Sequence, residues 1–265
     1  MTVAVVGSLS LDRVGGGTPR VGGCPYYAAR ALRSLDVPAI VIAKCAALDR
    51  QLLLPPLIRL GVPVVWHDSA VTAAFSFSYD GDRRQMTVDA LADPWTADEV
   101  TGALAAARWV HVAPLARTDF PPETLAALAK GRRLSLDGQG LVRPGRTGPL
   151  ELDAEYDPAL LRSVSILKLA DDEAELLAEG LDERALRRFG VPEVVVTLGS
   201  RGAVVFADGV AELVRAHPVA SADPTGAGDA FAAAYLVARS RGNAPTAAAR
   251  LASALVADLL AGRVA

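Results

Sequence analysis

The sequence has little of what builds cross-linked or metal-rich proteins. Its 265 residues include two cysteines, Cys24 and Cys45, and three histidines that lie far apart in the chain. Two cysteines give no disulfide framework, and the separated histidines lack the close spacing of a metal-binding set. We therefore expect neither a disulfide-stabilised secreted protein nor a structural zinc site.

The chain also lacks an excess of positive charge and a long apolar run. Its 27 Lys and Arg residues against 30 Asp and Glu residues give a net charge of −3 without a basic stripe, so nucleic acid is not expected as a partner. Every apolar run is interrupted before it reaches membrane-spanning length. Residues 2–6 resemble a strand and not a signal peptide. We expect a cytoplasmic protein without a membrane segment.

The chain does contain enough hydrophobic sequence for a large core, arranged as alternating strands and helices. Hydrophobic residues make up 51% of it. The expected strands are residues 3–6, 38–43, 62–66, 109–113, 133–137, 165–169, 194–197, 203–206 and 210–219. The expected helices are residues 24–35, 52–60, 96–107, 121–130, 171–177, 229–240 and 245–260. This alternation predicts one α/β domain over residues 1–265 with a mostly parallel sheet.

Local signals sharpen some of these boundaries. Thr96 and Glu99 have the spacing of a capping box at the start of a helix. Pro55 and Pro56 are expected to start the helix over residues 52–60. Residues 143–149 are expected to form a loop.

Residues 69–91 break the α/β rhythm. Aromatic and small polar residues alternate over residues 72–79, which places Phe75, Phe77 and Tyr79 on one face of a strand. Asp80 and Gly81 then signal a tight turn, and residues 83–88 return as a second strand. This antiparallel hairpin is either a β flap that closes over the strand ends or a plain edge hairpin.

The densest cluster of small residues is Asp223-Pro-Thr-Gly-Ala-Gly-Asp229, which a helix follows at once. Its glycines allow a sharp turn and a close approach of a ligand to the backbone. Unpaired amides and the positive end of the helix dipole make such a helix start an anion site. Asp229 could be a plain helix cap. The turn is longer and richer in Gly, Pro and Thr than a cap requires, which favours phosphate binding.

Other candidate residues stand near strand ends or helix starts. Asp12 follows the first strand and either binds a ligand there or caps a turn. Tyr26 and Tyr27 stand just after a glycine pair, where they either stack on a ligand or pack in the core. The acids between Asp171 and Glu175 either interact with the helix dipole or hold Mg²⁺ through water.

Taken together, these stretches resemble the PfkB, or ribokinase-like, family of carbohydrate and nucleoside kinases over nearly the whole chain. The turn at residues 223–229 is similar to the family's Asp-Thr-x-Gly-Ala-Gly-Asp signature, and residues 168–173 to its Lys-x-Asn-x-x-Glu element. Residues 197–202 are similar to its Thr-x-Gly-x-x-Gly nucleotide segment. The resemblance implies a three-layer αβα ribokinase-like fold with a mostly parallel central sheet. It also implies a small β lid, formed by about residues 12–21 and 69–91.

The resemblance further implies an ATP-dependent phosphotransferase that acts on a hydroxyl group of a sugar, a polyol or a nucleoside-like molecule. The residues that match the family's catalytic positions are Asp229 as the base, with the amides of Gly226, Ala227 and Gly228 as an anion hole. Those that match its substrate positions are Asp12, Gly22, Gly23 and Tyr27, and those that match its cofactor positions are Lys168, Thr197, Gly199, Gly202 and Thr225. Glu173 would act on Mg²⁺ through water. The family also suggests a monovalent cation and a homodimer formed through the lid.

The sequence departs from the family pattern mainly on the substrate side. Tyr27 and Ala170 stand where the family has asparagines, and only nine residues separate Asp12 from Gly22. These departures indicate an unusual substrate. They also motivate an alternative, a non-catalytic regulatory protein that binds nucleotide or sugar on the same fold. A dinucleotide-dependent oxidoreductase is disfavoured because no Gly-x-Gly-x-x-Gly follows the first strand, and no Gly-Lys-Ser/Thr of a P-loop occurs.

Overall fold

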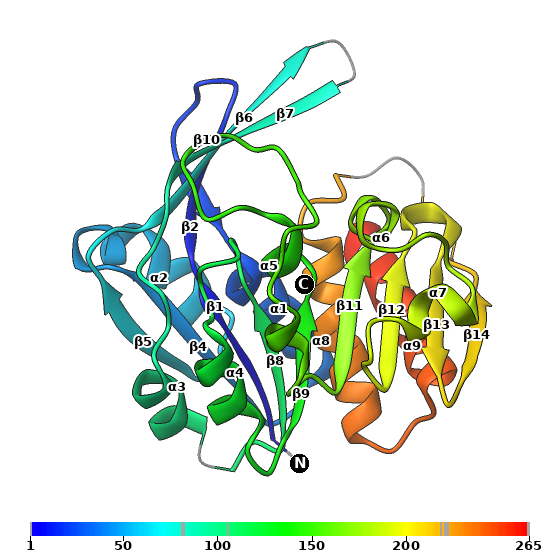
Figure 1. Cartoon of the computed structure of the whole chain (residues 1–265). Coiled ribbons are helices and arrows are strands. Elements are labelled where there is room, and N and C mark those ends of the chain that lie inside the picture. Colours follow the sequence, from blue (N-terminus) through cyan, green and yellow to red (C-terminus); the bar gives the residue numbers. More distant parts are fainter. Residues whose placement is uncertain (1, 81–82, 105, 218, 220–222, 264–265) are drawn as a thin grey trace.

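In the computed structural model, which describes residues 2–80, 83–104, 106–217, 219 and 223–263, nine strands form one large sheet (Figure 1). In order across the sheet they are β5 (Val64–Ser69), β4 (Ala39–Ala46), β1 (Val3–Ser8), β8 (Trp109–Ala113), β9 (Arg133–Asp137), β11 (Ile166–Ala170), β12 (Glu193–Thr197), β13 (Ala203–Ala207) and β14 (Val210–Val214). Neighbouring strands from β5 to β12 are parallel, and β13 and β14 are antiparallel. The mostly parallel sheet is therefore as the sequence predicts.

Helices cover both faces of this sheet and create two hydrophobic cores. One face packs against α1 (Cys24–Leu35), α2 (Arg50–Ile58), α8 (Ala227–Ser240) and α9 (Pro245–Leu260). The other packs against α3 (Ala97–Leu104), α4 (Pro122–Ala129), α5 (Gln139–Val142), α6 (Asp171–Leu177) and α7 (Glu183–Arg187). Single 3₁₀ turns lie at Ala47–Asp49, Pro158–Leu161 and Gly199–Arg201. This is the predicted three-layer αβα arrangement, because strands buried on both faces need helices on both sides.

A second, five-stranded sheet projects from the carboxyl end of the large one (Figure 1). Its strands run in the order β10 (Gly148–Pro149), β7 (Arg83–Ala90), β6 (Ala73–Asp80), β2 (Ser10–Val14) and β3 (Arg20–Gly22). Phe75 and Phe77 are buried in a small core with Val88 and Leu115. We call this sheet the lid. The side chain of Tyr79 and the turn residue Gly81 lie outside the described residues.

Three local expectations were wrong. Asp12 does not end the first strand, because β1 stops at Ser8 and Asp12 lies within β2 of the lid. Residues 143–149 are not all loop, since β10 pairs with β7. Pro55 and Pro56 lie inside α2, because a 3₁₀ turn leads directly into a helix that begins at Arg50. The two missing N–H donors are tolerated there, since the carbonyls that they would bond belong to exposed residues.

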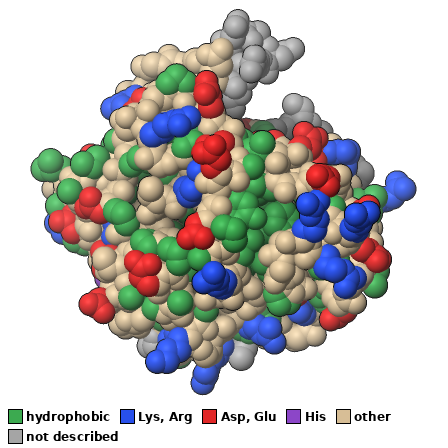
Figure 2. Space-filling view, in the orientation of Figure 1, with side chains coloured by type: hydrophobic (Ala, Val, Ile, Leu, Met, Phe, Trp, Pro, Cys, Tyr) green, Lys and Arg blue, Asp and Glu red, His purple; other side chains and the backbone are tan. Residues whose placement is uncertain are grey.

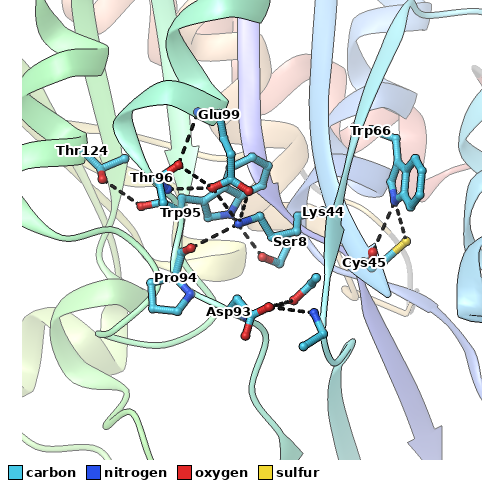
Figure 3. A network of polar contacts seen from close by, with 12 residues as sticks. Ser8, Lys44, Cys45, Trp66, Asp93, Pro94, Trp95, Thr96, Glu99 and Thr124 are labelled. Carbon is cyan, nitrogen blue, oxygen red and sulfur yellow. Dashed lines mark hydrogen bonds and ion pairs between the residues drawn. The ribbon is translucent and has the colours of Figure 1, made fainter. Parts of the chain in front are cut away.

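The base of the lid is fixed by a buried polar network beside the ends of β1 and β4 (Figure 3). The Lys44 ammonium lies 2.7 Å from a Glu99 carboxylate oxygen, donates to the Pro94 carbonyl at 3.1 Å, and lies 4.5 Å from the centre of the Trp95 ring. Thr96 and Glu99 form the predicted capping box, with the Thr96 N–H donating to Glu99 at 2.7 Å. The network thus joins β4 to the start of α3, just after the lid hairpin ends.

A second set of hydrogen bonds joins the two ends of the lid hairpin (Figure 3). The Asp93 carboxylate accepts hydrogen bonds from the Ala70 N–H at 2.7 Å and the Ser69 hydroxyl at 3.2 Å. Asp93 also donates its own N–H to the Ser69 hydroxyl at 3.0 Å. The chain therefore enters and leaves the lid hairpin through one hydrogen-bonded junction.

The surface carries charges of both signs. Figure 2 shows acidic and basic side chains over the same parts of the visible face. Among the described residues, no helix has the length and apolar character that crossing a membrane requires.

Candidate active site

The small-residue turn brings its functional groups to the start of α8. Gly226 is the residue before the helix, with φ at +77°, and no side chain caps this helix. Asp229 therefore lies in the first turn of α8 and is not its cap. The amides of Gly228 and Asp229 lie where a helix has no carbonyl of its own to bond. The Ala227 N–H donates to the Pro224 carbonyl at 2.9 Å, so an anion would have to displace that bond to reach it.

Tyr27 explains why the turn needs a glycine at position 226. A Cβ atom added to Gly226 would lie 2.1 Å from Cδ1 of the Tyr27 ring, far inside contact distance. The ring of α1 therefore packs directly against the turn before α8. Burial, followed by the charges of Asp12 and Asp229, raises the pKa of Tyr27 to about 12. The phenol stays protonated at neutral pH and can donate a hydrogen bond.

Asp229 has the electrostatic environment of a base that works near neutral pH. Burial raises its pKa to about 6, and the neighbouring Asp137 carboxylate contributes in the same direction. The Lys168 ammonium and the neighbouring Cys24 thiol oppose this rise. A carboxylate with a pKa near 6 is ionised at pH 7 and is a better proton acceptor than an ordinary aspartate.

A buried charge cluster lies beneath the turn. The Lys168 ammonium lies 3.1 Å from Asp137 Oδ2, and a Cβ atom added to Gly228 would be 3.2 Å from it. Burial lowers the pKa of Lys168, but the charges of Asp137, Glu173 and Asp229 outweigh this effect and raise it overall. Lys168 therefore remains charged below the anion site.

Glu173 closes the start of α6 within the same cluster. Its carboxylate accepts a hydrogen bond from the Ala170 N–H at 2.8 Å. Burial raises its pKa to about 7, although Lys168 lowers it. Among the described residues, no group of three or more His, Cys, Asp and Glu side chains could hold a metal ion. The role of Glu173 toward Mg²⁺ through water stays a prediction.

Two cavities meet at the turn. The first, which we call the lid cavity, has a volume of about 220 Å³ and lies between the lid and the large sheet. Its apolar wall is formed by Phe75, Phe77, Met86 and Leu115, and its polar groups come from Ser10, Asp12, Tyr27, Gln139, Arg143 and Asp229. The Ser10 hydroxyl donates to Asp12 at 2.8 Å, and a Cβ atom on Gly22 would lie 2.2 Å from the Asp12 carboxylate. Gly23 lines the cavity, whereas Gly22 supports Asp12.

The second cavity, which we call the helix cavity, has a volume of about 530 Å³ and lies between α8, α9 and the end of β12. Thr197, Gly199 and Gly202 line it. Their contact with a nucleotide stays a prediction. Its apolar wall is formed by Val219, Phe231, Val256, Ala257 and Leu260. Ala227 and Gly228 face this cavity, whereas Gly226 and Asp229 face the lid cavity. The turn is therefore the wall that the two cavities share.

One predicted site residue lies in a different cavity from the one expected, and several residues of the site were not predicted. Thr225 lines the lid cavity and not the helix cavity, and its hydroxyl donates to Asp223 at 2.6 Å. Cys24, Gln139 and Arg143 line the lid cavity without having been singled out. Asp137 was also missed. The available signal was its position, since it ends a strand and a Gly-Gln-Gly run follows it.

Comparisons with known proteins agree with this arrangement. A family model described as pfkB family carbohydrate kinase matches residues 60–260. A fructokinase of Salmonella thompson is 28% identical over 166 residues, which are 58% of this chain and 74% of that protein. An inositol 3-kinase of Oryza sativa subsp. japonica is 33% identical over 123 residues, which are 43% of this chain and 30% of that protein.

Solved structures match over almost the full chain. A pyrophosphate-dependent kinase in the ribokinase family, complexed with a pyrophosphate analog and myo-inositol, has a TM-score of 0.83 at 27% identity, covering 97% of this chain and 94% of that one. A nucleoside kinase of Burkholderia thailandensis has a TM-score of 0.75 at 22% identity, covering 98% of this chain and 90% of that one, and shows the shared fold alone.

Proposed function

The chain belongs to the PfkB family of carbohydrate kinases, and on that premise we propose that it transfers the γ-phosphoryl group of ATP to a hydroxyl group of a small cyclic polyol or sugar. The observation that carries the proposal is the shared wall. One glycine turn separates the helix cavity from the lid cavity, and Asp229 faces the lid cavity from that turn. A donor on one side and an acceptor on the other would meet at a single carboxylate.

The acceptor would bind in the lid cavity. Its volume of about 220 Å³ is below the usual range for drug-sized ligands, which suits a molecule of sugar size. Asp12 and Ser10 can accept and donate hydrogen bonds to hydroxyl groups, while Phe75 and Phe77 cover a less polar ring face. The clamped lid would exclude water and so limit hydrolysis of the donor.

The donor would bind in the helix cavity. An apolar cavity of about 530 Å³ with a few polar groups suits a nucleoside, and its glycine-lined end points to the turn. The bound Mg²⁺ would neutralise phosphate charge, with Glu173 acting through water. Asp229 would accept the proton of the attacking hydroxyl, and the first amides of α8 would stabilise charge on the phosphoryl group.

Pyrophosphate is the donor that competes with ATP in this proposal, because structurally similar kinases are described as pyrophosphate-dependent. The size and apolar lining of the helix cavity favour a nucleotide, since pyrophosphate has no apolar part to fill it. A panel that combines ATP, GTP or pyrophosphate with hexoses and inositols, read by product mass, separates the two. Faster turnover with pyrophosphate than with any nucleotide would refute the nucleotide donor.

The Asp229→Asn variant tests the assignment of the base. We expect kcat to fall by about 10² to 10⁴ because the variant cannot accept the proton, with donor affinity unchanged. In the wild type, kcat/KM should rise with pH through about 6 and then level off, because only ionised Asp229 accepts a proton. Asp208→Asn, on an exposed turn, is the control.

Retained turnover in Asp229→Asn would contradict the assignment of Asp229 as the base. A wild-type protein that binds nucleotide or sugar without turning it over would indicate the alternative, a regulatory protein.

A further inference from the structure

We propose that Arg143 is a catalytic residue that binds two oxygens of the phosphoryl group while it is transferred. This proposal rests on the proposed kinase function and adds a residue to its mechanism. Arg143 lines the lid cavity together with Asp229 and Gly226, so its guanidinium group belongs to the space where donor and acceptor would meet.

The backbone of Arg143 is held from two sides. It follows the short helix α5, and its N–H donates to the Gln139 carbonyl at 3.0 Å. Its carbonyl accepts a hydrogen bond from the Arg117 N–H at 2.8 Å. The Arg117 guanidinium in turn donates to the Leu141 carbonyl at 2.7 Å. The position of Arg143 is therefore built into the framework and does not depend on movement of the lid.

Among the described residues that line the lid cavity, Arg143 carries the one cationic side chain. Its charge reaches the carboxylates of the site. Burial raises the pKa values of Asp229 and Glu173, and Arg143 is among the groups that lower them. Because Arg143 and Asp229 line the same cavity of about 220 Å³, a phosphoryl group that approaches Asp229 would enter the space that Arg143 also lines.

The two cationic side chains of the site differ in their partners. Lys168 forms an ion pair with Asp137 at 3.1 Å. In contrast, no ion pair or side-chain hydrogen bond within the described part of the chain involves the Arg143 guanidinium. A partly buried guanidinium without a protein partner is suited to an anionic ligand, because its planar fork matches two phosphate oxygens.

In the proposed step the acceptor oxygen forms a bond to the γ-phosphorus, and its proton passes to Asp229. The bond from phosphorus to the bridging oxygen of the donor breaks, and its electron pair leaves with the diphosphate. Arg143 would hold two non-bridging oxygens of the group in transit from the lid side, while the first amides of α8 contact it from the other side. Charge spread over these oxygens is what catalysis of phosphoryl transfer has to stabilise.

The test compares Arg143→Gln and Arg143→Lys with Arg146→Gln, an exposed arginine on the same segment. We expect Arg143→Gln to lower kcat by about 10² to 10³ with the KM of the acceptor changed less than about threefold, and Arg143→Lys to recover part of the loss. In Arg143→Ala, millimolar guanidinium ion should raise kcat, which a merely structural role would not allow. Arg146→Gln should behave as the wild type.

Binding of a phosphoryl mimic separates the possible failures. ADP with tetrafluoroaluminate and acceptor should bind Arg143→Lys at least tenfold more weakly than the wild type. A kcat within threefold of the wild type in both Arg143→Gln and Arg143→Lys, or a change in acceptor KM alone, overturns the proposal for Arg143. If the wild type itself makes no phosphorylated product with any donor and acceptor, the proposed function fails, and the role of Arg143 fails with it.

Discussion

At the scale of single residues, Asp229, the proposed base, shares its environment with a thiol. Cys24 begins α1 and is buried, and it lines the lid cavity together with Asp229, whose pKa it lowers. Burial and then the charge of Asp229 raise the pKa of Cys24 well above its usual value. The thiol therefore stays protonated and can donate, which stabilises the ionised form of the base.

Removing this donor should shift the pH dependence of the reaction. In Cys24→Ala, Asp229 loses a group that lowers its pKa, so the acidic limb of the kcat/KM profile should move to higher pH. Cys24→Ser keeps a donor and should restore the limb. Cys45→Ala is the matched control, because the Cys45 sulfur is a buried partner of the Trp66 ring N–H at 3.2 Å and does not line the lid cavity. An unchanged limb in Cys24→Ala would show that the thiol does not tune the base.

At the scale of elements, the active-site turn has its shape because two helices pack closely. α1 places Tyr27 against the turn, and α8 begins directly after it. The turn therefore depends on positive φ at Gly226 and also on the missing side chain there. These two requirements can be separated, because the chain contains another glycine with a similar backbone and open surroundings.

Gly226→Ala and Gly242→Ala form the matched pair. Their φ values are +77° and +87°, but a Cβ atom meets Tyr27 at Gly226 and nothing within 4 Å at Gly242. Both variants should lose about 1 kcal/mol of unfolding free energy from backbone strain, and Gly226→Ala should lose more because the Tyr27 ring has to move. Only Gly226→Ala should also lose activity, by about 100-fold or more if one anion contact is displaced. Chemical denaturation and steady-state kinetics measure the two effects. Equal kinetics in the pair would contradict the role of the Tyr27 contact.

At the scale of the whole molecule, one buried acid ties α8 to the central sheet. Glu193 begins β12 and is buried; it accepts hydrogen bonds from the Tyr235 hydroxyl and from Arg239 Nη2 at 2.9 Å. Both partners lie on α8, the helix that begins with the active-site turn. The anchor therefore holds the catalytic helix in register with the strands.

Glu193→Gln should lower the free energy of unfolding by about 2 kcal/mol, because it leaves the half-buried Arg239 charge without its partner. Urea denaturation measures this change. Glu179→Gln breaks the ion pair with Arg188 on the surface and should have no measurable effect, since exposed pairs contribute little. A loss of similar size in both variants would show that the Glu193 cluster is not a special anchor.

How far the sequence predicts this molecule depends on how local each feature is. The capping box at Thr96, the lid hairpin and the glycine turn before α8 are encoded by neighbouring residues, and all were predicted. The resemblance implied a lid segment at about residues 12–21, but local pattern did not predict strand β2, because its parallel partner β6 lies about 60 residues away. Arg143 was not predicted for the same reason. It is far from Asp229 in the sequence, and the two residues come to line one cavity only in the folded chain.

The shared wall at the active-site turn has a consequence for how the chain can diversify. Among the residues that the structure describes, those lining the helix cavity lie between 197 and 260, whereas the side chains of the lid cavity come from residues 10–143 and the turn. Under the proposed function, the contacts to the acceptor and to the donor would come from separate segments of one polypeptide. Exchanging the N-terminal segment between relatives should then change the acceptor and leave the donor site unchanged.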